Sequence, residues 1–291
     1  MAFLPLRNVA IDTNAQSRQA EWLEQIDRAL DDPTTDRNDL CRDILRSLWF
    51  PDWEGRDPAS MSLATQITFD QLDPRNVTLE PEYYREIDLD KYSQVKPLQW
   101  LWEMFDRTTL GENIQLGIAF RRLLAKRIFR RCGKNFKAFQ QVKFSCGYNI
   151  EVGDGVVIHR HVLLDDRGGI EFGDGASVSD FANIYSHNHD IVDGREVFMP
   201  KTTIGAGARI TYHATILAGA NVAPDSMVGA GSILTRPTEP HWVYVGVPAR
   251  KVKEKPAAER AAKRGRTGDP LSEDGPQGHP VDAPPPPRPG E

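Results

Sequence analysis

The stretch TTIGAGARITYHATILAGANVAPDSMVGAGSILT, residues 202–235, decides the fold of this chain. A helix would place apolar residues about 3.6 positions apart with few glycines, and an ordinary strand would alternate every second residue. Here glycine recurs just after an aliphatic position, and most aliphatic positions are followed four residues later by a compact side chain. A period of six residues indicates a solenoid. The aliphatic positions are Ile204, Ile210, Ile216, Val222, Val228 and Leu234.

The same spacing continues upstream, at Val152, Ile158 and Leu164 and again at Phe172, Val178 and Ile184. Three such hexads form one triangular coil of a parallel β-helix, in which each side is a short strand and the aliphatic side chain points inward. A single coil cannot bury its own apolar column, so coils are stable only when stacked. We expect a mainly β protein with about five coils over 140–235 in a domain of residues 135–255. We expect helices to cap it, before the first coil and after Pro248.

Two interruptions break the period of six. The segment DDRGGI (165–170) carries two extra residues, and YSHNHDIVDGREVFMPKTT (185–203) leaves the coil as a loop. Solenoids carry their function in such excursions, so chemistry is expected here. His189 begins the loop among polar neighbours. An imidazole with an ordinary pKa of about 6.5 suits removal of a proton from a hydroxyl near neutral pH.

The flanking regions differ from the repeats. Residues 1–134 form a helical N-terminal region, because residues 17–31, 36–49 and 97–132 place apolar residues at helical spacing, with Asp36 as an N-cap. Five of the six Trp lie in it, and we expect it to have a small core of its own. Residues 256–291 hold nine of the 21 Pro and no aromatic residue, so we expect a disordered tail.

Composition excludes several classes of protein. A net charge of −5 argues against a protein that grips nucleic-acid phosphates, so no nucleic-acid partner is expected. No apolar run approaches the roughly 20 residues of a membrane-spanning helix, and no secretory signal is visible. The three Cys are scattered without CxxC spacing, which fits a reducing, cytoplasmic location better than a disulfide framework.

Two longer segments resemble a known family. FSCGYNIEVGDGVVIHRHVLLDDRGGIEFGDGASVSDFANIYSHNH (144–189) and GAGSILTRPTEPHWVYVGVPARKVK (229–253) are similar to hexapeptide-repeat maltose and galactoside O-acetyltransferases. The short loop and its HNHD sequence also resemble acetyltransferases of exopolysaccharide assembly. The resemblance implies a left-handed parallel β-helix, a cyclic homotrimer, acetyl-CoA as the acetyl donor and a saccharide or other small-molecule hydroxyl as the acceptor. No metal is implied.

The resemblance also assigns roles to residues. The family's general base falls on His189, which would deprotonate the acceptor hydroxyl as that oxygen attacks the thioester directly. Acceptor-binding positions fall on Ser145, on His159 (where the family has Asn) and at or beside Asp166. Three of the donor-binding positions are cationic, which suits a 3′-phosphorylated nucleotide. The donor-binding positions are Tyr212, Ala230, Thr235, Arg236, Arg250 and Lys253.

Two other classes remain open. Gamma-type carbonic anhydrases share this fold and bind zinc with an HxxxxH pair. The histidine pairs here are two residues apart, and Ala218 stands where a pair beginning at His213 would need its second His. A non-catalytic assembly scaffold is the other alternative, suggested by His159, Tyr212 and the large N-terminal region.

Overall fold

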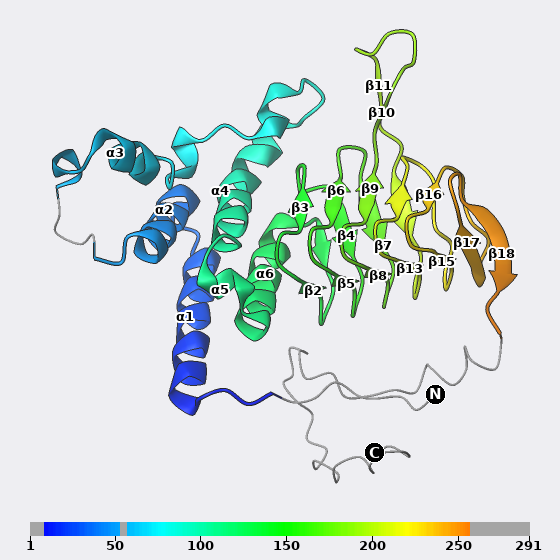
Figure 1. Cartoon of the computed structure of the whole chain (residues 1–291). Coiled ribbons are helices and arrows are strands. Elements are labelled where there is room, and N and C mark those ends of the chain that lie inside the picture. Colours follow the sequence, from blue (N-terminus) through cyan, green and yellow to red (C-terminus); the bar gives the residue numbers. More distant parts are fainter. Residues whose placement is uncertain (1–8, 53–56, 257–291) are drawn as a thin grey trace.

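The computed structural model describes residues 9–52 and 57–256. Figure 1 shows helices gathered at one end of a solenoid and a hairpin projecting from its side. The predicted order, a helical N-terminal region followed by a parallel β-helix, is confirmed. The tail predicted for 256–291 lies, apart from Pro256, outside the described residues.

The helices of the N-terminal region begin at polar caps. Asp36, the predicted N-cap, accepts hydrogen bonds from the backbone N–H groups of Asn38 and Asp39 at 2.7 and 3.3 Å. The prediction of one helical stretch over 97–132 is wrong in one respect. The helix ends at Phe105, and the helix Ile114–Ile128 begins at its own N-cap, Asn113. No described helix is long and apolar enough to cross a membrane. The helices are α1 Thr13–Asp31, α2 Arg37–Trp49, α3 Leu63–Asp70, α4 Leu89–Phe105, α5 Thr109–Glu112 and α6 Ile114–Ile128, with 3-10 turns η1 Pro58–Ser60, η2 Pro74–Asn76 and η3 Glu80–Tyr83.

The N-terminal region shares its core with the β-helix. Trp102 of α4 is fully buried, donates its indole N–H to the carbonyl of Val142 at 3.0 Å, and packs edge-on against Phe144 with ring centroids 5.4 Å apart. Arg121 of α6 is also buried and donates to the carbonyl of Ala138 in the first coil. The expectation of a separate core is therefore wrong: one continuous apolar core joins the helices to the coils.

Three sheets, parallel except for the final strand β18, form the sides of the β-helix, which has about six turns. It has one turn more than predicted, because the first coil begins at Arg131 and a strand after residue 240 continues the second sheet. The first sheet holds β1 Arg131–Cys132, β4 Ile150–Val152, β7 Ile170–Phe172 and β12 Thr202–Ile204. The second holds β2 Lys137–Ala138, β5 Val157–Ile158, β8 Ser177–Val178, β13 Arg209–Ile210, β15 Met227–Val228, β17 Trp242–Val245 and β18 Arg250–Glu254. The third holds β3 Lys143–Phe144, β6 Leu163–Asp165, β9 Asn183–Tyr185, β14 Thr215–Ile216 and β16 Ile233–Leu234.

The register stacks the predicted aliphatic positions in columns. Ile210 pairs with Val178 on one side and Val228 on the other, and all three are completely buried. Because successive side chains of a strand point to opposite faces, their neighbours point outward. The period of six therefore corresponds to one inward residue per side of each coil.

The corner between the second and third sheets has a left-handed residue in each of the five coils that contribute a strand to both sheets. Gln141, His161, Phe181, His213 and Gly231 have φ between 56° and 67°. The rings of His161 and Phe181 stack at 4.8 Å, and those of Phe181 and His213 at 5.0 Å. We call this stack of three rings the ring ladder.

The C-terminal end differs from the prediction. The chain after Pro248 forms β18, which pairs antiparallel with β17, so the predicted capping helix is wrong. Gly246, at φ 100°, belongs to the turn that folds the chain back. The returning backbone then satisfies its hydrogen bonds on the open edge of β17, which a helix would leave unpaired.

Candidate active site

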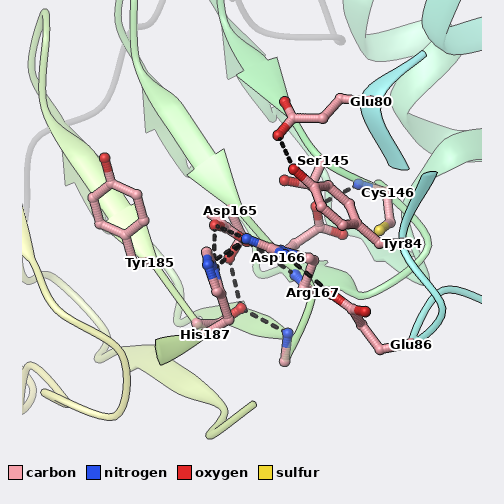
Figure 2. Close-up of polar contacts among 12 residues, drawn as sticks. Glu80, Tyr84, Glu86, Ser145, Cys146, Asp165, Asp166, Arg167, Tyr185 and His187 are labelled. Atoms are coloured by element: carbon pink, nitrogen blue, oxygen red, sulfur yellow. Dashed lines mark hydrogen bonds and ion pairs between the residues drawn. The ribbon is translucent and has the colours of Figure 1, made fainter. Parts of the chain in front are cut away.

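Both interruptions of the repeat lie at the same corner, which follows the third sheet. Asp165 ends β6 and pairs with Tyr185 at the end of β9 in the next coil. The excursion that follows contains a two-stranded hairpin, β10 Asn188–His189 and β11 Val197–Phe198. Ser145 of the preceding coil lies at this corner too, and its backbone N–H donates to the carbonyl of Leu164. Figure 2 shows the polar side chains gathered here.

A histidine and an aspartate from consecutive coils lie in direct contact. His187 Nδ1 lies 2.5 Å from Asp165 Oδ2, and both side chains are nearly buried. Arg167 also approaches both groups, with Nε 3.3 Å from Asp165 Oδ1 and Nη2 2.8 Å from His187 Nδ1. Burial lowers the pKa of His187 and the neighbouring carboxylate opposes that shift. The His187 imidazole is thus held by its neighbours on two sides.

The N-terminal region reaches this cluster. Glu86 Oε1 lies 3.1 Å from Arg167 Nη1, and the Arg167 guanidinium carbon lies 4.8 Å from the centroid of the Tyr84 ring. The Tyr84 hydroxyl donates to Glu80 at 2.6 Å. Sequence reasoning missed Glu86 and Tyr84, because no spacing or motif links their segment to the repeats.

His189 is in a different situation from His187. It lies exposed on β10, with Nδ1 2.7 Å from the carbonyl oxygen of Gly194. A carbonyl only accepts, so this contact requires a proton on Nδ1, and the neutral form of the ring then carries its lone pair on Nε2. The two imidazoles lie edge to face, with centroids 5.3 Å apart. Of the two rings, that of His189 is the one open to a substrate.

The other predicted acceptor-binding residues are not all brought together. Asp166 is fully buried, and its Oδ1 accepts the backbone N–H of Cys146 at 2.7 Å. Its carboxylate is therefore closed to an acceptor, and Asp165 beside it is the acid that contacts a histidine. His159 lies at the corner of the ring ladder, stacked on Phe139 at 4.7 Å, and burial lowers its pKa. Within one chain, His159 and His189 belong to different corners.

The predicted donor-binding residues lie along the C-terminal coils, and all are exposed. Tyr212 and Ala230 belong to the corner of the ring ladder, whereas Thr235 and Arg236 follow β16 at the corner of the candidate site. Arg250 and Lys253 belong to β18. Over residues 9–52 and 57–256, no group of three or more His, Cys, Asp or Glu side chains could hold a metal ion.

Several known acetyltransferases are similar to this chain in sequence. No protein-family model matches the sequence. The galactoside O-acetyltransferase of Escherichia coli K12 is 28% identical over 138 residues, which are 46% of this chain and 68% of that protein. This chain is a homologue of O-acetyltransferases. Serine acetyltransferases also match, but the chain spans less than half of their length.

Solved structures share the solenoid. The maltose O-acetyltransferase from Clostridium difficile 630 is 25% identical with a TM-score of 0.52, over 60% of this chain and 92% of that one. A galactoside acetyltransferase in complex with coenzyme A is 24% identical with a TM-score of 0.53, over 61% of this chain and 88% of that one. The latter likeness shows the common fold. The resemblance drawn from residues 144–189 and 229–253 is confirmed.

Proposed function

We propose that this chain transfers the acetyl group of acetyl-CoA to a hydroxyl of a sugar or glycoside. The observation that carries the proposal is the setting of His189, which is exposed on the hairpin and whose Nδ1 lies 2.7 Å from the Gly194 carbonyl oxygen. A neutral imidazole with an open nitrogen on an exposed hairpin can act as a general base. The homologues named O-acetyltransferases support the same reaction class.

The reaction is a direct attack. His189 Nε2 takes the proton of the acceptor hydroxyl as its oxygen adds to the thioester carbonyl carbon. The tetrahedral intermediate then collapses, the carbon–sulfur bond breaks, and the departing thiolate recovers the proton from the imidazolium. The products are the acetyl ester and coenzyme A. No covalent enzyme intermediate is needed.

The acceptor would lie at the corner that carries the candidate site. Ser145 is half-buried there, so its hydroxyl is proposed to contact the acceptor. The acidic acceptor-binding residue, expected at or beside Asp166, is proposed to be Asp165, because the Asp165 carboxylate is the one that contacts His187. His159 would contribute from another copy of the chain, since it belongs to a different corner.

We also propose a homotrimer with its sites between copies. Ile191 and Val192 in the loop are 99% and 91% exposed, and Phe181 and Tyr212 at the ring ladder's corner are about half exposed. Apolar surface of this kind marks contact sites. A closed ring would place the loop of each copy against the ring-ladder corner of the next, which brings His189 toward His159.

The donor would bind along the C-terminal coils. Tyr212, Ala230 and Thr235 are proposed to contact it. Arg236, Arg250 and Lys253 would supply charge-assisted hydrogen bonds to its phosphates. A cytoplasmic location is proposed as well, because all three cysteines are free thiols and acetyl-CoA is the donor.

The test is incubation of the protein with acetyl-CoA and a panel of glycosides, followed by mass spectrometry for acetylated products. We expect an acetylated sugar and stoichiometric free coenzyme A with the wild type, and far less of both in the same time with His189→Ala. No product with any acceptor, or equal product from His189→Ala, would overturn the proposal. Bound-metal analysis of the same sample tests the zinc-enzyme alternative, which predicts bound zinc. The alternative of a non-catalytic scaffold predicts no acetylated product.

A further inference from the structure

The candidate site includes one contribution from outside the β-helix. The segment after η3 runs from the N-terminal helices to the corner that follows the third sheet, where the backbone N–H of Asp88 donates to the hydroxyl of Tyr148 in the first coil at 3.1 Å. Glu86 and Tyr84 of this segment contact Arg167. Nothing in the transfer reaction itself requires these residues, so their role is unexplained.

The contact between Glu86 and Arg167 is shielded from solvent. The Arg167 and Glu86 side chains are 9% and 18% exposed. A nearly buried guanidinium is stable only when its charge is matched by well-placed acceptors. Arg167 has two such acceptors, Glu86 on the side of the N-terminal region and Asp165 on the side of the β-helix.

Asp165 is therefore shared between two partners. Its Oδ1 lies 3.3 Å from Arg167 Nε, while its Oδ2 lies 2.5 Å from His187 Nδ1. If Glu86 were absent, the guanidinium would depend on Asp165 alone and compete with the imidazole for that carboxylate. His187 is the last residue before β10, so a change in its position moves the strand that carries His189.

We propose that Glu86 is a positioning residue: it shares the charge of Arg167 with Asp165, so that Arg167 does not draw Asp165 away from His187 and the Asp165–His187 pair fixes the root of the hairpin that carries His189. Tyr84 completes the arrangement by covering the face of the guanidinium. The N-terminal region thereby acts on the site through Arg167 rather than by touching the substrate. The kinetic part of this inference rests on the proposed function, whereas its structural part does not.

The experiment compares Glu86→Ala with Glu103→Ala. Glu103 is a matched control, because it is 16% exposed and also pairs across the same boundary, with Lys143 of β3 at 3.4 Å. Two kinds of measurement are made on the full chain: hydrogen–deuterium exchange of the hairpin 188–198, and steady-state kinetics that give kcat and KM for acetyl-CoA. Glu86→Gln, which keeps an acceptor oxygen for Arg167, is the conservative variant and the substitute if Glu86→Ala does not fold.

We expect Glu86→Ala to speed exchange in the hairpin and to lower kcat roughly tenfold without changing KM for acetyl-CoA, since small misplacements of a catalytic group have effects of that size. Glu103→Ala should change neither, and Glu86→Gln should be intermediate. In a His187→Ala background the Glu86→Ala effect should disappear, because the positioning path is already broken.

Three results would overturn the proposal. They are hairpin exchange that is the same in Glu86→Ala and Glu103→Ala, a kcat effect that persists unchanged in the His187→Ala background, and a fall in kcat that Glu103→Ala reproduces. If the wild type transfers no acetyl group, the proposed function fails but the exchange measurement still decides whether Glu86 orders the hairpin.

Discussion

Asp165 and His187 lie in consecutive coils, and Oδ2 of the first is 2.5 Å from Nδ1 of the second. This pair holds one imidazole of the HNHD sequence against the β-helix and leaves the other, His189, on the exposed hairpin. Two identical side chains two residues apart therefore have different surroundings.

Replacing His189 with Ala should lower kcat by about 10²–10⁴-fold, which is the usual contribution of a positioned general base. KM for acetyl-CoA should barely change, because the imidazole acts on the acceptor proton. His187→Ala should cost only about tenfold, through a displaced hairpin. Steady-state kinetics of both variants checks this, and equal, small effects would show that neither is the base.

Asp166 should make stability depend on pH. Burial raises the pKa of its carboxyl to about 6, above the value of about 3.9 in an unfolded chain, so the folded chain binds a proton that the unfolded chain has released. The stabilisation by protonation is complete below about pH 4 and is lost as pH rises through about 6. Raising the pH from about 4.5 to about 7.5 should therefore lower the free energy of unfolding of the wild type, relative to that of Asp166→Asn, by about 1–3 kcal/mol, as measured by urea unfolding. A difference between the two proteins that stays constant with pH would contradict this.

The buried pair of Asp106 and Arg121 should be costly to break. Arg121 Nη2 lies 2.6 Å from Asp106 Oδ1, and both side chains are at most 2% exposed. Asp106→Ala should lower the free energy of unfolding by about 3–5 kcal/mol, because it leaves a buried charge without its partner. Glu24→Ala is the control, since Glu24 and Arg28 are 69% exposed and 4.0 Å apart. Similar midpoints in urea for both variants would rule this out.

Inward-pointing side chains of the β-helix should tolerate replacement by Ala far less than outward-pointing side chains of the same strand. Ile210→Ala should lower the free energy of unfolding by about 2–5 kcal/mol, since Ile210 is completely buried between coils. Arg209→Ala, one residue earlier and exposed, should change it by less than about 0.5 kcal/mol. Thermal or urea unfolding of the pair tests the assignment of inward positions, which equal losses would refute.

Assembly can be measured directly. Light scattering at micromolar concentration should give about three times the chain mass of 32.7 kDa, because the proposed sites need a second copy. Tyr212→Glu should reduce that mass by placing a charge on the contact surface. A wild-type protein of single-chain mass would contradict the trimer.

The sequence predicted the β-helix because its signal is local and repeated. Ile210 could be placed inward from spacing alone, and its stacking against Val178 and Val228 follows from the period. The extra coil and the strand at residues 250–254 could not be predicted in the same way. The first coil keeps the spacing of six, but with Cys132, Ala138 and Phe144 rather than aliphatic residues of one kind, and the spacing lapses after Leu234. At the ends of a solenoid, edge hydrogen bonding decides the structure rather than the repeat.

The site was predicted only in part, for a different reason. The loop histidine could be located because the excursion is visible in the sequence. The partners of His187 could not, since Asp165 and His187 meet only because two interruptions fall at one corner of neighbouring coils. The pairing of Glu86 with Arg167 depends on where a non-repetitive segment returns, and no local pattern encodes that.

The two ends of the β-helix have consequences for its length. Helix α6 packs on the first coil, and β18 ends the second sheet with an exposed edge that carries four charged residues out of five. Charged edge strands discourage end-to-end pairing of molecules into fibres. Because the ends rather than the interior stop propagation, the number of coils is free to vary. A whole coil inserted between β14 and β15 would lengthen the rod while leaving both ends and the hairpin corner unchanged.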